Sequence, residues 1–251
     1  MKALARRTLF YLGLLVLWQL LASAKVWDEV LFPGPLKVWE ALRAGFADGS
    51  YPIALAVSGK RLAIGFGVSL VGGVALGLLL GRVRLLDETL GSLVSGLQVL
   101  PSICWLPSAI LWFGISEAAI LFVVIMGALL AVAVAVDGGV KSVPPVYLRQ
   151  ARTMGVSGPR LWLEVILPAS LPALLTGAKL GWSFAWRSLM AGELLSISMG
   201  LGSLLQTGRD LNDMSQVFAV MLLIAGAALA VDRLVFGPLE RRVRRVWGLT
   251  V

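Results

Sequence analysis

Long stretches without a charged residue limit the possible folds of this chain more than any other feature of its sequence. Four such stretches are 18 to 28 residues long: Leu62–Gly81, Thr89–Ser116, Ala118–Val136 and Met214–Val231. About 20 apolar residues are needed for a helix to cross the hydrocarbon core of a bilayer, and a charge at its centre costs several kcal/mol. Each stretch can therefore form a transmembrane helix.

The composition agrees with a chain whose surface faces lipid. Hydrophobic residues make up 58% of the 251 residues and charged residues 14%, and the mean hydropathy is +0.88. Soluble domains carry about 25% charged residues. The chain has no histidine, which argues against His-dependent triads and the usual His-ligated zinc and haem sites. The single cysteine, Cys104, cannot form an intrachain disulfide and is expected to be a small buried residue.

Two weaker segments raise the predicted number of transmembrane helices to six. Residues 8–24 are uncharged, and three charges interrupt the apolar segment that follows Ser170. The predicted spans are residues 8–27, 60–81, 91–112, 117–137, 170–193 and 214–235, in one all-α transmembrane domain over residues 1–251. A cleavable signal peptide has the same order of basic, apolar and small residues as the amino terminus, so both interpretations stay open. We favour a retained helix because the apolar character continues through Val26 and Trp27.

The basic residues indicate the orientation of these spans. With the amino terminus in the cytoplasm, 13 Lys and Arg residues fall in cytoplasmic segments and 6 in external segments, in agreement with the positive-inside rule. Both termini are then cytoplasmic. The net charge of +8 is mainly a consequence of this topology and does not indicate nucleic-acid binding.

Three features predict local structure and packing. Residues 36–43 have helical apolar spacing and predict a short helix at the outer interface, ended by Asp48-Gly49.

In the third span, Pro101 and Pro107 each remove a backbone hydrogen bond, so that helix should bend or break. It is then either a wall of a transport pathway or a kinked packing helix. In the second span, small residues recur every four positions and should allow close helix packing: Gly65, Ser69, Gly73, Gly77 and Gly81.

A long cytoplasmic loop, residues 138–169, is predicted to display two short amphipathic helices at about a right angle. The first ends near Met154, with Gly155 well placed as a left-handed cap, and Ser157 with Pro159 suits the start of the second. The pair can serve as a docking surface or as an interfacial anchor with arginines toward anionic lipid.

One face of the fifth span carries all of its ionisable side chains. Lys179, Arg187 and Glu193 lie on the same side at 100° per residue, along about 21 Å of helix. Ser183, Trp186 and Met190 share that face. It can line a pathway, with Arg187 and Ser183 donating to an anion and Trp186 shaping a gate. Alternatively, Lys179 snorkels to the cytoplasmic interface, Glu193 lies near the outer one, and Arg187 pairs with a carboxylate on a neighbouring helix.

The loop resembles the characteristic cytoplasmic motif of binding-protein-dependent ABC importer permeases. Gln150-Ala151, Gly155 and Leu167-Pro168 stand where that family has a Glu-Ala-Ala-like start, a glycine and a Leu-Pro. Over roughly residues 55–247, further segments are similar, in order, to the nitrate, sulfonate, taurine and bicarbonate branch. They are Leu100-Pro101 with Trp105-Leu106-Pro107, Leu111–Ile115, Pro168–Pro172 with Thr176-Gly177, Ala185-Trp186 before Glu193, and Gly200–Gly202.

The resemblance implies the six-helix type I importer fold, with the loop as a coupling helix seated in a groove of a separate ATPase subunit. The implied coupling residues are Arg149, Gln150, Ala151, Met154, Gly155 and Val156. Where the family commonly opens the motif with Glu, this chain has Arg149-Gln150 and lacks a carboxylate that could pair with the ATPase. The chain contains no G-x-x-x-x-G-K-[ST] phosphate loop. ATP and Mg²⁺ are therefore expected on the partner subunit, and no cofactor or metal on this chain.

We therefore predict the non-enzymatic membrane subunit of an ATP-driven importer in the bacterial inner membrane. Its pathway for a small anion would be lined by Ser183, Trp186, Arg187, Met190, Glu193, Pro101 and Pro107. The expected partners are two ATPase subunits, a second permease copy, an external binding protein and membrane lipid. Two alternatives are a stand-alone secondary transporter, which should have repeated halves and a coupling-ion carboxylate, and a lipid-headgroup enzyme, which needs clustered acidic or His residues at the interface.

Overall fold

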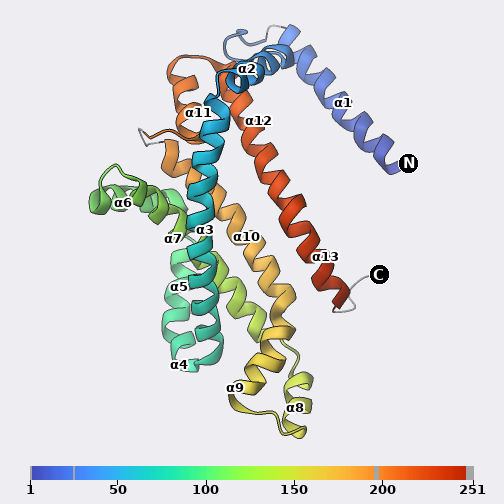
Figure 1. Cartoon of the computed structure of the whole chain (residues 1–251), viewed down its shortest axis with the longest axis vertical. Helices are drawn as coiled ribbons and strands as arrows, with labels where there is room; N and C mark the ends of the chain where they lie inside the picture. The colour runs from blue at the N-terminus through green and yellow to red at the C-terminus, as the bar shows by residue number, and fades with distance from the viewer. Residues whose placement is uncertain (1, 25, 195–197, 247–251) are drawn as a thin grey trace. The chain divides into compact units, whose positions relative to one another are not determined.

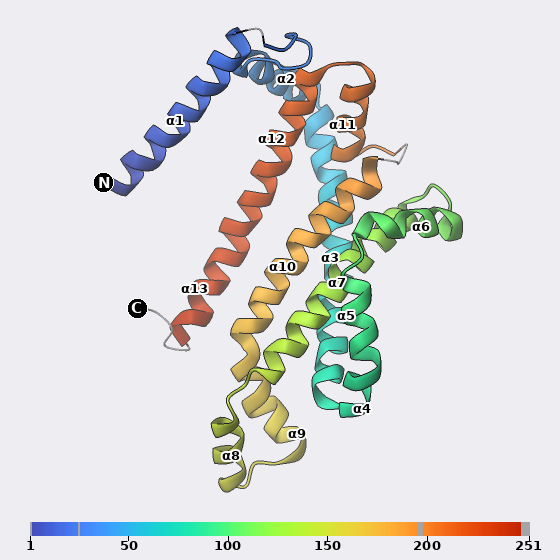
Figure 2. The same cartoon turned by 180° about the vertical axis from the view of Figure 1, so that it is seen from behind.

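The residues that the computed structural model describes, 2–24, 26–194 and 198–246, form helices joined by turns and short loops (Figures 1 and 2). Three segments are π-helical turns (η1, η3 and η4), and η2 is a 3₁₀ turn. In chain order the elements are α1 (Lys2–Ser23), α2 (Pro35–Ala47), α3 (Ser50–Arg82), α4 (Arg84–Leu86), η1 (Asp87–Gly91), α5 (Ser92–Gln98), η2 (Ser102–Trp105), α6 (Leu106–Phe113), α7 (Glu117–Lys141), α8 (Pro145–Thr153), α9 (Gly158–Leu161), η3 (Trp162–Ile166), α10 (Leu167–Leu194), α11 (Leu201–Asp210), α12 (Met214–Val231), η4 (Asp232–Phe236) and α13 (Gly237–Val246).

Four continuous helices in the described residues are long and apolar enough to cross a membrane: Ser50–Arg82, Glu117–Lys141, Gly158–Leu194 and Met214–Val246. Each contains one of the predicted spans. A bent pair, Arg84–Gln98 with Ser102–Phe113, can supply a fifth crossing. The α1 helix covers the first predicted span as far as Ser23, but it is not among the four.

The third predicted span is bent by 102° between α5 and α6, as its prolines predict. The bend lies at Pro101, whose carbonyl accepts a hydrogen bond from the Cys104 amide at 2.9 Å. Pro107 causes no second break, because it stands in the first turn of α6, where a missing N–H is tolerated. The expectation that Cys104 is buried is wrong: it lies on the short turn η2 and is exposed.

The chain divides into two compact units, and the first contains Met1–Ser58 and Ile197–Ala227. Its aromatic centre is the ring of Phe218, which lies 6.0 Å from the rings of both Trp18 and Phe32. The short helix predicted over residues 36–43 forms as α2, followed by the C-cap residue Asp48 and by Gly49 with φ +81°. The N-terminus of α11 is fastened to α3, since the Leu201 amide donates to the buried Ser58 Oγ at 2.8 Å.

The second unit, Gly59–Ser196 with Ala228–Val251, is centred on α7, which packs against both α3 and α10. The predicted small-residue stripe of α3 faces α7. A Cβ added at Gly77 would lie 2.5 Å from the Ala133 carbonyl oxygen, and one at Gly73 2.7 Å from the Val132 Cβ. Close approach of the two backbones therefore requires glycine at these positions.

The contact between α7 and α10 also depends on glycines that let the two backbones approach closely. These helices lie side by side in both views of the structure (Figures 1 and 2). Gly139 of α7 faces the Ala173 Cβ, and Gly177 of α10 faces the Ala135 Cβ, so each helix offers a glycine to an alanine of the other. Three tightly packed helices thus form a rigid frame that carries the charged side chains described next.

Candidate pathway, outer ion cluster and coupling elbow

The predicted left-handed cap at Gly155 is present and forms the sharp turn that follows α8. Gly155 has φ +80°, a conformation that residues with a Cβ rarely adopt. Its amide donates to the Arg152 carbonyl at 3.0 Å, and the Val156 amide donates to the Ala151 carbonyl at 2.9 Å. These two bonds define a Schellman motif, which closes the helix end and reverses the chain.

The α8 helix has a buried face and an exposed face. Ala151 is buried with Val140, Val143, Leu161 and Ile166 in one hydrophobic cluster, against which Val156 packs. The other predicted coupling residues are exposed: Arg149, Gln150, Met154 and Gly155. Met154 is 82% exposed, a high value for a large apolar side chain. The cluster holds α8 and the turn at Gly155, together called the elbow, in place. The exposed residues stay available for contact with another surface.

The second half of the loop differs from the expected pair of short helices. A helix does begin after Ser157 with Pro159 in its first turn, but it continues through η3 into α10 as one helix, Gly158–Leu194. The helix continues through Pro168 because the preceding turn is π-helical, with the Leu167 amide donating to the Trp162 carbonyl. A π turn shifts the backbone hydrogen bonds by one residue. Pro168, which has no N–H to donate, is accommodated at this shift.

The polar face predicted on the fifth span lies on α10, but its residues have different surroundings. Ser183 is exposed, and its hydroxyl donates to the Lys179 carbonyl at 3.2 Å. Met190 is half-buried, and Trp186 is 8% exposed. The buried Trp186 Nε1 has no hydrogen-bond partner among the described residues.

Lys179, at the other end of this face, forms ion pairs. Its Nζ lies 2.8 Å from Asp232 Oδ1 and 3.8 Å from Glu240 Oε2.

Arg187 and Pro101, predicted from different spans to line a pathway, border the same hollow. This hollow has a volume of about 230 Å³ and lies where α5 ends and η2 begins, against α7 and α10. Pro107 does not line it and is exposed on α6. The guanidinium carbon of Arg187 lies 5.6 Å from the centre of the Phe184 ring. In the described residues Arg187 has no carboxylate within ion-pair distance.

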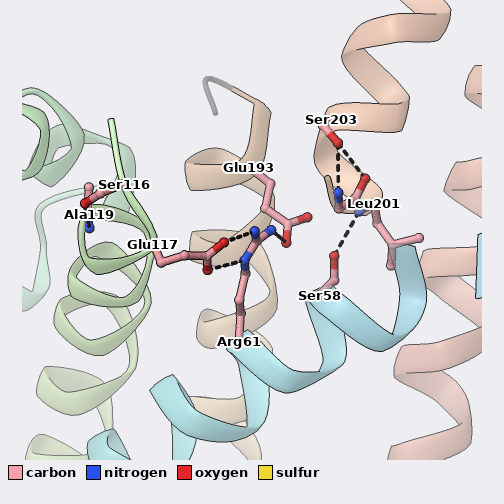
Figure 3. A network of polar contacts seen from close by, with 9 residues as sticks. Ser58, Arg61, Ser116, Glu117, Ala119, Glu193, Leu201 and Ser203 are labelled. Atoms are coloured by element: carbon pink, nitrogen blue, oxygen red, sulfur yellow. Dashed lines mark hydrogen bonds and ion pairs between the residues drawn. The ribbon is translucent and has the colours of Figure 1, made fainter. Parts of the chain in front are cut away.

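Glu193, the last residue of the predicted polar face, belongs to a buried ion cluster. Arg61 of α3 donates from Nη1 to Glu193 Oε1 at 2.7 Å and from Nε to Glu117 Oε2 at 2.7 Å, and a second bond joins Arg61 to Glu117 Oε1. Figure 3 shows the two carboxylates of α7 and α10 reaching Arg61 from different sides. Arg61 is 3% exposed and Glu193 0%. Arg61 therefore joins three helices, α3, α7 and α10.

Sequence reasoning missed the roles of Arg61 and Glu117, although a signal was present. Arg61 is the second residue of one predicted span, Glu117 is the first residue of another, and Glu193 is the last residue of a third. In the topology predicted from the basic residues, all three positions lie at the external end of their span. Opposite charges at one membrane depth indicate ion pairing between helices, since unpaired charges there are costly.

One protein family matches most of the chain. Residues 73–245 match the family described as "Binding-protein-dependent transport system inner membrane component". A putative ABC transporter permease protein of Methanocaldococcus jannaschii is 32% identical over 223 residues, which are 87% of this chain and 83% of the relative. The taurine transport system permease protein TauC of Escherichia coli is 29% identical over 235 residues, 92% of this chain and 85% of the relative.

A third relative and one solved structure extend this comparison. The bicarbonate transport system permease protein CmpB of Synechococcus elongatus is 28% identical over 237 residues, covering 89% of this chain and 84% of the relative. Among solved structures, a chain of the MetNI methionine ABC transporter superposes with a TM-score of 0.67 at 18% identity, covering 78% of this chain and 97% of that one. At this identity the superposition establishes a common fold.

Proposed function

This chain belongs to the family of binding-protein-dependent transport system inner membrane components and is the permease subunit of an ABC importer, and we propose that its solute is a small anion. A relative named for bicarbonate, which is an anion, supports this class, as does one named for taurine, a zwitterion whose sulfonate group is anionic. The sequence resemblance to the nitrate and sulfonate branch also supports it. The family works with ATPase subunits and a solute-binding protein in the inner membrane.

The observation that carries the anion proposal is that Arg187 has no carboxylate partner among the described residues. It lies within α10, seven residues or about 10 Å before the end of the helix, and it is exposed without a carboxylate partner in the described part of the chain. An arginine at such a depth in an apolar helix is costly unless it faces a pathway or a partner. An uncompensated guanidinium on the wall of a pathway attracts anions and repels cations.

Energy is proposed to reach the pathway through the elbow at Gly155. The exposed face of α8, with Arg149, Gln150 and Met154, would seat in a groove of the ATPase subunit, which binds ATP and Mg²⁺. Because α9, η3 and α10 form one helix, a displacement of the elbow is transmitted directly to the helix that carries Arg187. With Arg149-Gln150 in place of the family's usual Glu, this contact would rely on packing and on hydrogen bonds.

The complete permease is proposed to have six membrane crossings per copy and to act as a homodimer with both termini in the cytoplasm. Six crossings require α1 and the bent pair in addition to the four continuous helices. A second copy is favoured by the large exposed apolar side chains around the bend, among them Val99, Leu111 and Trp112, which are 61–83% exposed. A pathway between two copies would cover this surface.

Co-purification and uptake test the proposal. Tagged permease, extracted from its own membranes in a mild detergent, should bring down a subunit with a Walker motif and form dimers in light scattering. Reconstituted with that ATPase and its binding protein, it should take up labelled nitrate, bicarbonate or taurine only when ATP is supplied. Uptake that continues without ATP or without the binding protein contradicts the proposal and favours a stand-alone transporter.

A further inference from the structure

We propose that the hollow at the bend between α5 and η2 is an anion-binding subsite of the permease itself, formed by Arg187, Gln98 and Ser102. The inference rests on the proposed anion import and deepens it. It assigns the residues that hold the solute within the membrane subunit, after the binding protein has released it. It also moves the hydrogen-bond donors from Ser183, where the sequence pattern places them, to the broken helix.

The bend creates the space for this subsite. The α5 helix stops at Gln98, and the chain turns by 102° before it resumes as η2 and α6. A continuous helix would fill this position with side chains. Instead, the structure has a hollow of about 230 Å³, bordered by the last residues of α5, by Pro101 and Ser102, and by side chains of α7 and α10. At about 30 Å³ for each water molecule, this is room for roughly seven waters or for one small hydrated anion.

Close helix packing keeps the turn η2 in its place beside α10. A Cβ added at Gly127 of α7 would lie 3.0 Å from the Ser102 Cβ and 3.1 Å from the Ser188 Cβ. The turn, α7 and α10 therefore meet at one glycine. This contact fixes Ser102 and Arg187 on neighbouring sides of the hollow.

Three polar side chains that line the hollow have no hydrogen-bond or ion-pair partner in the described residues. They are Gln98 at the end of α5, Ser102 at the start of η2 and Arg187 on α10. Ser183, by comparison, already donates to a backbone carbonyl. Unused polar groups that converge from separate elements are unfavourable in an apolar surrounding unless water or a ligand satisfies them.

The chemistry of this lining favours an oxyanion. The guanidinium of Arg187 offers a planar set of N–H donors that matches carboxylate-like or sulfonate-like oxygens. The amide of Gln98 and the hydroxyl of Ser102 can add a neutral donor each. Trp105 and Phe184 supply apolar walls, and no Asp or Glu lines the hollow. The ligand class is therefore a compact oxyanion or sulfonate.

The larger hollow at the other end of α10 offers a contrast. It measures about 460 Å³ and is lined by two cations, Lys179 and Arg244, together with Glu240. Lys179 is paired with Asp232, and Arg244 is paired with Glu240 at 2.6 Å. Because its positive charges are already compensated, that hollow has no comparable attraction for an anion. Of the two, the hollow beside Arg187 is the one whose charge is uncompensated.

A thiol-protection experiment on the full permease–ATPase complex tests the subsite without the binding protein. In a Cys104→Ser background, Val99→Cys places one thiol on the lining of the hollow. The rate of its modification by an uncharged maleimide is measured in lipid nanodiscs at increasing concentrations of sodium nitrate, sodium bicarbonate or taurine. Sodium chloride keeps the ionic strength constant, because chloride lacks the paired oxygens that a guanidinium binds. We expect saturable protection by at least one of the three probes.

The variants separate the roles of the three side chains. Arg187→Gln should raise the half-protecting concentration at least about tenfold, as expected for the loss of a charged hydrogen bond. Gln98→Ala and Ser102→Ala should each raise it about threefold, and Arg187→Lys should restore part of the loss. Arg84→Gln is the matched control, because the Arg84 side chain is 92% exposed and pairs with the nearby Glu88. Equal protection in wild type and Arg187→Gln would overturn the subsite.

ATP-dependent uptake by the same preparations distinguishes the two proposals. If wild type imports none of the anions with its ATPase and binding protein, the proposed function fails. If wild type imports one of them, but no probe protects the thiol and Arg187→Gln transports normally, only the subsite fails. If Arg187→Gln binds the probes weakly and imports slowly while still stimulating the ATPase, both proposals are supported.

Discussion

At the scale of single residues, three cations on α3 and α10 illustrate how a membrane helix accommodates charge. Arg61 is buried between two glutamates, and Lys179 is half-exposed beside Asp232. Arg187 is the exception, since its only described interaction is with a ring. Paired charges in an apolar medium are tolerated because each partner offsets the desolvation of the other, whereas an unpaired charge implies a functional use.

We predict unequal contributions from the two carboxylates that contact Arg61. Replacement of Arg61 by Met breaks a buried ion pair with Glu193, which should cost about 3–5 kcal/mol of stability. Glu117→Gln should cost less than about 1 kcal/mol, because its side chain is 59% exposed and water compensates the loss. Unfolding of the detergent-purified permease, followed by tryptophan fluorescence, measures both.

The same measurement includes a rescue. Arg61→Met combined with Glu193→Gln removes the buried charge along with its partner, so the double variant should regain part of the lost stability. If Arg61→Met and Glu117→Gln are equally mild, the cluster does not fasten the three helices.

At the scale of elements, glycines decide how closely the helices approach. The stripe on α3 is regular enough to be recognised from spacing, and the structure adds the identity of the facing helix. That helix is α7, whose Val132, Val136 and Val140 lie against Gly73, Gly77 and Gly81. Without a hydrophobic driving force between helices in lipid, such backbone contact is a main source of association.

Gly77→Val should therefore destabilise the permease while Gly67→Ala does not. A side chain at Gly77 meets the Ala133 carbonyl and the Val136 side chain, and overpacking of this kind costs roughly 1–3 kcal/mol. Gly67 lies on the same helix and has no atom within 4 Å of an added Cβ, so alanine there should be neutral or slightly stabilising. The melting temperatures of the two variants provide the comparison, and a similar loss in both would contradict the close-contact explanation.

The elbow gives a second prediction at this scale. Gly155→Pro cannot adopt φ +80°, so the exposed face of α8 should lose its orientation while the membrane helices stay folded. We expect the ATPase of the assembled importer to lose its stimulation by solute-loaded binding protein. Ser157→Ala is the control, since the Ser157 side chain makes no capping hydrogen bond. Normal stimulation in Gly155→Pro would count against a docking role for the elbow.

At the scale of the whole molecule, the distribution of charge predicts how the chain is threaded through the membrane. The chain has a single natural cysteine, so Cys104→Ser provides a background for single-cysteine mapping. Arg160→Cys, in the first turn after the elbow, should be labelled only from the cytoplasm. Asp210→Cys, at the end of α11, should be labelled from outside by an impermeant thiol reagent. Reversed accessibility of the two sites would invert the topology.

Much of the architecture is encoded locally and can be predicted from the sequence. Apolar length identifies the crossings, proline identifies the bend at Pro101, and glycine identifies the left-handed cap at Gly155 and the close-packing face of α3. Each of these depends on one residue type or on one period, and so needs no knowledge of what lies opposite. The continuous helix through Pro168 was not predictable in this way, because a π turn depends on the packing around it.

The sequence by itself determined that this chain is a helical membrane protein of the importer permease family, without a phosphate loop of its own. The tertiary structure decided which charges are compensated. It joined Arg61 to two glutamates far along the chain, and it placed Arg187 beside the unused donors of Gln98 and Ser102. The physical reason is that pairing depends on distances between side chains of different helices, and helical periodicity describes only one helix at a time.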